Sequence, residues 1–136
     1  MTEIKKITKI SILVYGIVCL VFAIYLIFFL DIFLAVVDMP EWQNPYHPRM
    51  FGGAMLVVVL FALLVFFKKD WEREKIKLGY ELLYFWLIIN IIMESSLLAI
   101  YVSELSLGAL FENILDIIIM AILLVLGVYA YIKQRE

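Results

Sequence analysis

The chain has 136 residues, of which 66% are hydrophobic and 18% are charged, and its mean hydropathy is +1.06. Soluble domains contain roughly 45–50% apolar residues, so this composition excludes a water-soluble protein. The formal net charge is −2 and the sequence has no basic patch, so we expect no nucleic-acid partner. The single cysteine, Cys19, excludes a disulfide framework within the chain.

Four apolar runs follow one another, and each is near the ~20 residues that cross the hydrocarbon core of a bilayer as a helix. They cover residues 10–30, 50–67, 78–102 and 107–132. These runs are too long and too uniformly apolar for strands, and helices satisfy their own backbone hydrogen bonds within lipid. The sequence therefore predicts an all-α fold, an integral membrane four-helix bundle formed as one domain by residues 1–136.

Basic residues mark one side of the predicted bundle. Ten of the eleven Lys and Arg residues precede the first run, lie between the second and third, or follow the fourth, and Arg49 is the exception. By the positive-inside rule, the sequence predicts a multi-pass protein of the cell membrane with both termini in the cytoplasm. The ten residues are Lys5, Lys6, Lys9, Lys68, Lys69, Arg73, Lys75, Lys77, Lys133 and Arg135.

The two longer connections carry further helix signals. Residues 31–37 are expected to form a helical extension of the first span at the membrane interface. Pro48 is expected at the start of the second helix, because proline suits the first helical position. Asp70 is expected to cap the third helix, which then starts about two turns before it enters the membrane. Glu81, near that boundary, is expected to reach water or to pair with Lys77.

Small residues recur within the runs and have two interpretations. They allow helix backbones to approach closely, or they reflect only how common glycine is in spanning helices. The residues are Gly16, Ala23, Gly52, Gly53, Ala54 and Gly127.

Acidic and amide side chains lie inside the last two runs. Asn90 and Glu94 are four residues apart and share one helix face, while Asn113 and Asp116 lie near the start of the fourth run. A short turn joins these runs, so the helices should be antiparallel neighbours. At about 1.5 Å per residue, Glu94 and Asp116 lie roughly 10–14 Å below the outer surface. We expect these two carboxyl groups to face each other, with the two asparagines beside them.

Glu112 is shallower, and we expect it nearer to Arg49 at the outer end of the second helix. Ionisable residues in spanning helices are rare and are functional-site candidates by default. Three interpretations stay open. The first is a polar network that fixes helix register, the second is a site for a proton, cation or cationic ligand, and the third is catalysis.

Catalysis has the least support. A dimetal carboxylate site in a helical bundle needs two Glu-x-x-His motifs, and the single histidine, His47, lies in a loop. We expect no catalytic residues, no metal ligands and no cofactor.

Two stretches carry a family resemblance. Residues 45–53, Pro-Tyr-His-Pro-Arg-Met-Phe-Gly-Gly, lead into the second run, and Trp71, Lys77 and Glu81 lead into the third. Together they resemble small uncharacterised prokaryotic four-span membrane proteins, DoxX-like and related families of unknown function. The resemblance covers residues 41–86 and implies a four-helix architecture without an established activity. Glu94 and Asp116 lie outside it.

From these observations we expect a small, non-enzymatic integral membrane protein whose surroundings are the lipid bilayer. The leading hypothesis is an accessory subunit of a membrane complex or a homo-oligomer. The alternative is a transporter or channel element that uses Glu94 and Asp116 for protons, cations or a small ligand.

Overall fold

The computed structural model describes residues 4–37, 46–67 and 73–135. Five helices lie within these ranges: α1 (Lys6–Phe28), α2 (Leu30–Val37), α3 (Tyr46–Phe67), α4 (Arg73–Tyr101) and α5 (Leu107–Arg135). Of these, α1, α3, α4 and α5 are each long and apolar enough to cross a membrane. The prediction of an all-α protein with four long apolar helices is confirmed.

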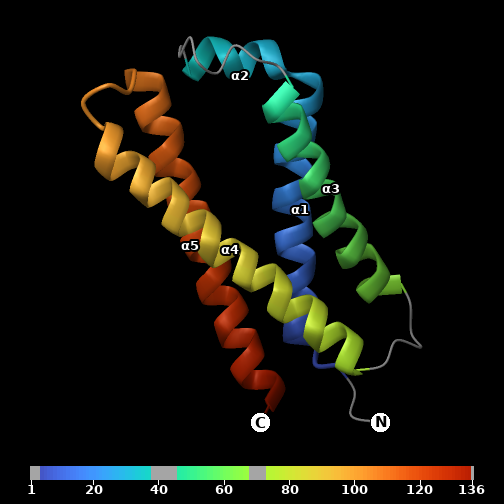
Figure 1. Ribbon diagram of the computed structural model, residues 1–136. Helices are drawn as coiled ribbons and strands as arrows, with labels where there is room; N and C mark the ends of the chain where they lie inside the picture. Colours follow the sequence, from blue (N-terminus) through green and yellow to red (C-terminus); the bar gives the residue numbers. More distant parts are fainter. Residues whose placement is uncertain (1–3, 38–45, 68–72, 136) are drawn as a thin grey trace.

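The two ends of the helix bundle differ in charge. Both chain termini lie at one end, which we call the termini end, and α2 lies across the opposite end, the α2 end (Figure 1). Arg49 is at the start of α3, at the α2 end. Lys68 and Lys69 lie outside the described residues. The other basic residues lie on the first turns of α1 and α4, on the last turn of α5 or just before α1, all at the termini end.

Helix α1 forms the centre of the packing. It packs most extensively against α3 and also contacts α5, whereas α4 packs mainly against α5 and scarcely touches α3. The helices thus form two pairs, α1 with α3 and α4 with α5 (Figure 1). The buried core joins all four, with Ile12 and Cys19 from α1, Val58 from α3, Leu87 from α4 and Leu123 from α5.

Small residues set the distance between paired helices. A Cβ atom at Gly16 of α1 would lie 2.6 Å from the Cβ of Ala62 in α3, and Gly52 of α3 packs against the Ala23 carbonyl of α1. By contrast, a Cβ at Gly53 would meet nothing within 4 Å. The close-approach interpretation therefore holds at Gly16 and Gly52 but not at Gly53.

The first apolar run does not form one helix throughout. Helix α1 ends at Phe28, the N–H of Phe29 donates to the Tyr25 carbonyl at 3.0 Å, and Leu30 begins α2. Residues 31–37 are helical as expected, but they form a separate helix that turns away from α1 (Figure 1). That α2 lies at a membrane interface stays a prediction.

Helix α2 packs against the first turn of α5. Leu26, Leu30 and Phe33 form a buried apolar cluster with Ala109. Next to it, Gly108 lies directly against the backbone carbonyl of Val36, where a Cβ atom would collide. This contact joins α2 to the start of α5 at the α2 end of the bundle.

The other helix ends follow local sequence signals. Ser106 caps α5 by accepting a 3.0 Å hydrogen bond from the Ala109 N–H on its hydroxyl oxygen. Helix α3 begins at Tyr46, which puts Pro48 in its first turn. The expected N-cap of α4, Asp70, lies outside the described residues. Helix α4 has 29 residues and is about 43 Å long, more than the ~30 Å of a bilayer core, which leaves room for its charged first turns outside such a core.

Candidate functional site

A hydrogen bond joins the polar groups of the last two helices at the α2 end. The Asn113 side-chain amide of α5 donates to the Glu94 carboxylate of α4. Asn113 is only 6% exposed, and Glu94 is partly buried. Because this bond runs between helices, the two side chains fix the register of α4 on α5 at this depth.

Asp116 lies one turn further along α5 and adds a second carboxyl group. It lies near the carboxyl groups of Glu94 and Glu112, close enough for like charges on them to repel each other. Its Oδ1 atom and the Oδ1 atom of Asn113 are both buried without a hydrogen-bond partner among the described residues. The amide oxygen of Asn113 is always an acceptor, and the Asp116 carboxyl group is acceptor-only when it is ionised, so the two atoms suit an N–H or O–H donor or a cation. We call Glu94, Asn113 and Asp116 the acidic cluster.

The remaining predicted site residues are placed differently. The Asn90 side chain donates to the Trp86 carbonyl of its own helix at 2.8 Å and makes no hydrogen bond to the acidic cluster. Glu112 is half-buried and lies near the Tyr25 hydroxyl of α1. Arg49 is exposed, and among the described residues no ion pair joins it to a carboxylate of the acidic cluster. The charge of Arg49 is therefore not paired there.

The acidic cluster is not arranged as a polydentate metal site. Among the described side chains, no group of three or more His, Cys, Asp or Glu residues could hold a metal ion. The acidic cluster instead consists of two carboxyl groups and one amide, groups whose oxygens are hydrogen-bond acceptors.

A second polar network lies deeper in the bundle and was not singled out from the sequence. The Ser11 hydroxyl of α1 lies 2.5 Å from the Tyr84 hydroxyl and 3.2 Å from the Tyr80 hydroxyl, both in α4. The Tyr80 hydroxyl donates to the Gly127 carbonyl of α5 at 2.7 Å. We call Ser11, Tyr80 and Tyr84 the tyrosine network. It links three helices through buried hydroxyl groups.

The sequence held a signal for the tyrosine network. Ser11 and Tyr15 are four residues apart, as are Tyr80 and Tyr84, so each pair shares a helix face. Tyrosine hydroxyls within apolar runs need a hydrogen-bond partner when they are buried. What the sequence does not give is which helix supplies that partner.

Aromatic contacts continue from the tyrosine network to the termini end. The Tyr131 ring of α5 stacks on Tyr80 with a centroid distance of 6.0 Å. Its hydroxyl donates to Glu81 at 2.6 Å and accepts from the Arg135 guanidinium at 2.7 Å. Glu81 is thus bound to Tyr131 across α4 and α5, and the expected pairing with Lys77 is not observed.

No protein-family model matches the chain, and the curated proteins and solved structures compared with it give no match either. The resemblance of residues 41–86 to DoxX-like proteins therefore stays a prediction.

Proposed function

We propose that this chain is a small integral membrane protein that binds and transports a proton or a small cation at the acidic cluster, between α4 and α5. The observation that carries the proposal is the pair of buried acceptor atoms, Asn113 Oδ1 and Asp116 Oδ1, without a donor among the described residues. A buried polar atom that lacks its hydrogen bond costs about 1–3 kcal/mol. A positively charged or hydrogen-bond-donating ligand would remove that cost.

The chemistry of the acidic cluster favours a positive ligand. Two of its members are carboxyl groups, and the amide donor of Asn113 is already used by Glu94. Among the described residues, no ion pair joins a basic side chain to Glu94 or Asp116. Charged groups at this depth are stable only when they are paired or hydrated, so a proton or a cation is the ligand that fits.

Flux measurements in proteoliposomes test this function. The purified protein is reconstituted with a pH-sensitive dye inside, and proton flux is followed after a pH step, with and without sodium or potassium gradients. Glu94→Gln and Asp116→Asn should abolish the flux, because each removes a charge while keeping the side-chain shape. In Glu94→Gln the amide oxygen can still accept the hydrogen bond from Asn113, so the fold should be retained.

The matched control is Glu104→Gln, in the turn between α4 and α5. Glu104 is exposed and lies outside the acidic cluster, so its variant should transport like the wild type. A wild-type protein without cation-dependent flux, or a Glu94→Gln variant with unchanged flux, would refute a transport role for the acidic cluster.

We also propose assembly with a second copy or with another membrane subunit, because α4 is poorly covered in its last half. From residue 88 to residue 101 no side chain of α4 is fully buried, although this half carries Asn90, Glu94 and Ser95. Polar side chains in spanning helices are usually buried against other helices rather than left in lipid. A neighbouring protein helix would provide that cover.

Cysteine crosslinking in native membranes tests assembly. In a background with Cys19 replaced by alanine, Ser95→Cys on α4 should form crosslinked species, because Ser95 is exposed on the uncovered half. Val125→Cys on α5, which is also exposed but lies on an entirely apolar stretch, is the control. Only monomer at both positions would contradict assembly through α4.

A further inference from the structure

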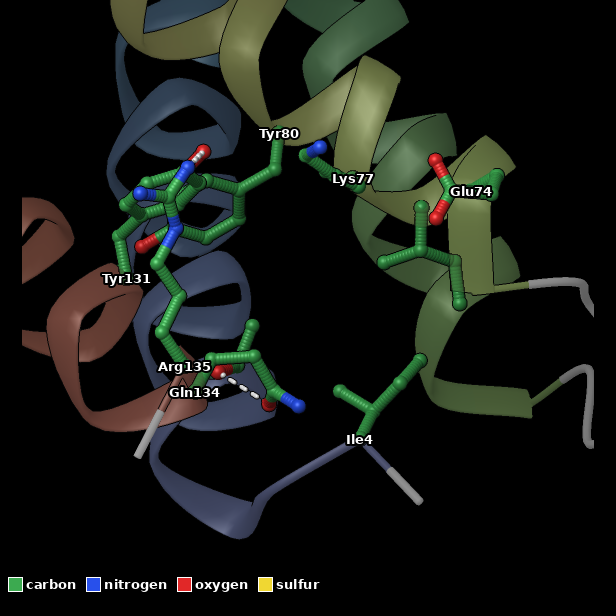
Figure 2. A pocket seen from close by; sticks show the side chains of 9 residues that line it. Ile4, Glu74, Lys77, Tyr80, Tyr131, Gln134 and Arg135 are labelled. Atoms are coloured by element: carbon green, nitrogen blue, oxygen red, sulfur yellow. Dashed lines mark hydrogen bonds between the residues drawn. The ribbon is translucent and has the colours of Figure 1, made fainter. Parts of the chain in front are cut away.

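A cavity of about 250 Å³ opens at the termini end, away from the acidic cluster. It lies between the start of α1, the start of α4 and the end of α5 (Figure 2). Figure 2 shows Tyr131 and Arg135 on one side, Glu74 on the other, and Lys77 between them. The Thr8 hydroxyl donates to the Gln134 side chain at 2.9 Å and joins α1 to α5 beside the cavity.

The charge of the cavity lining is positive. Lys77 and Arg135 oppose a single acid, Glu74, so the three sum to +1. Within the described part of the chain, the Lys77 ammonium has no hydrogen-bond or ion-pair partner. Arg135 is held by the Tyr131 hydroxyl, with its guanidinium 4.6 Å from the ring centroid. A guanidinium carries five N–H donors, so further donors remain for a ligand.

The backbone adds to this positive potential. Helix α1 begins at Lys6 and α4 begins at Arg73, so two helix N-termini lie at the termini end. A helix N-terminus carries a partial positive charge from its unpaired N–H groups. The cavity therefore combines the Lys77 ammonium and the remaining N–H donors of Arg135 with two helix N-termini and one helix C-terminus, and this net positive environment suits a phosphate group.

We propose that this cavity binds the phosphodiester headgroup of an anionic membrane lipid that carries one negative charge. Lys77 and Arg135 contact the phosphate, and the apolar side chains of Ile4 and Ile76 in the lining contact the glycerol and the first acyl carbons. Basic pockets between spanning helices, at the end that faces the anionic leaflet, are known headgroup sites. A free phosphate would match the charges but would gain nothing from the two isoleucines. This inference does not depend on the acidic cluster.

Native mass spectrometry of the full chain tests the proposal. The protein is released from a detergent without phosphate groups and incubated in parallel with dioleoylphosphatidylglycerol, dioleoylphosphatidylcholine or glycerol 3-phosphate. The anionic lipid should be retained in preference to the zwitterionic one. Lys77→Gln should reduce its retention about fivefold, which is the usual effect of one basic side chain near a membrane surface.

Two further variants should differ from Lys77→Gln in their effect on lipid retention. Glu74→Gln should raise retention of the anionic lipid, because it removes the opposing charge. Lys6→Gln removes an exposed charge of the same end that does not line the cavity, and it should leave retention unchanged. Lys77 and Glu74 are both exposed, so these variants should fold normally.

Equal retention of the two lipids, or an equal loss in Lys77→Gln and Lys6→Gln, would overturn the assignment of this cavity. If glycerol 3-phosphate were retained as strongly as the anionic lipid, the ligand would be a free phosphate compound, and the assignment to a membrane lipid would be wrong.

Discussion

Asn113 of α5 donates a hydrogen bond to Glu94 of α4, and the amide oxygen of the same Asn113 side chain is left without a donor among the described residues. One buried side chain thus performs two tasks. Its nitrogen joins two helices through a hydrogen bond. Its oxygen, like that of Asp116, is an acceptor that a cation or a hydrogen-bond donor could bind. The structural and the binding interpretations of the acidic cluster are therefore compatible.

Replacing Asn113 by leucine should destabilise the protein by about 0.6–2 kcal/mol, the range for hydrogen bonds between spanning helices. Unfolding by steric trapping in bicelles measures this change. Asn90→Leu is the control, because its hydrogen bond stays within α4, and it should have a smaller effect. Equal losses of stability at the two positions would show that the hydrogen bond between Asn113 and Glu94 does not add to the free energy of unfolding.

The tyrosine network should behave as one unit. Ser11→Ala should cost about 1–3 kcal/mol, because it leaves the buried Tyr84 hydroxyl without its 2.5 Å partner. Tyr84→Phe should cost less, because the Ser11 hydroxyl keeps its 3.2 Å contact with Tyr80. The double variant should cost less than the sum of the two, with a coupling of about 0.5 kcal/mol or more. A double-mutant cycle measured by the same unfolding assay checks this. Strict additivity would show that the 2.5 Å contact is not an effective hydrogen bond.

Gly16 and Gly53 offer a matched pair of glycines in spanning helices. Gly16→Ala should destabilise the protein by about 1–3 kcal/mol, the usual cost of overpacking, since its new methyl group would lie 2.6 Å from Ala62. Gly53→Ala meets open space and should be neutral or slightly stabilising, because alanine is the better helix former. Thermal unfolding of both variants in the same detergent provides the comparison, and a reversed order would contradict the packing of α1 on α3.

The orientation in the membrane can be tested with one engineered cysteine at a time, because Cys19 is the single cysteine of the sequence. With Cys19 replaced by alanine, Glu104→Cys in the turn between α4 and α5 should react with a membrane-impermeant maleimide on intact cells. Lys6→Cys at the termini end should react only after permeabilisation. The opposite pattern would place the termini outside and overturn the prediction from the basic residues.

The four long helices were predictable because each apolar run is about as long as a membrane-spanning helix and too long for a strand. The break between α1 and α2 was less evident, since Phe28-Phe29-Leu30 contains neither glycine nor proline. Packing of α2 against Ala109, from a distant part of the chain, accounts for the turn. A tertiary contact of this kind cannot be inferred from local propensity.

Side-chain partners were only partly predictable, for a related reason. Helical spacing assigned Asn90 and Glu94 to one face, but Asn90 satisfies its amide on the Trp86 carbonyl of its own helix. A polar side chain within an apolar helix can hydrogen-bond either to the backbone of its own helix or to a neighbouring helix. The sequence alone does not show which of the two occurs, and the tyrosine network consists of hydrogen bonds to neighbouring helices.

The contact between Gly108 and the Val36 carbonyl has a mechanical consequence. Because the two backbones touch without an intervening side chain, any larger residue at position 108 would have to push α2 and the start of α5 apart. The same contact thus ties the fit of α2, and with it the apolar cluster of Leu26, Leu30 and Phe33, to a glycine at the start of the last helix.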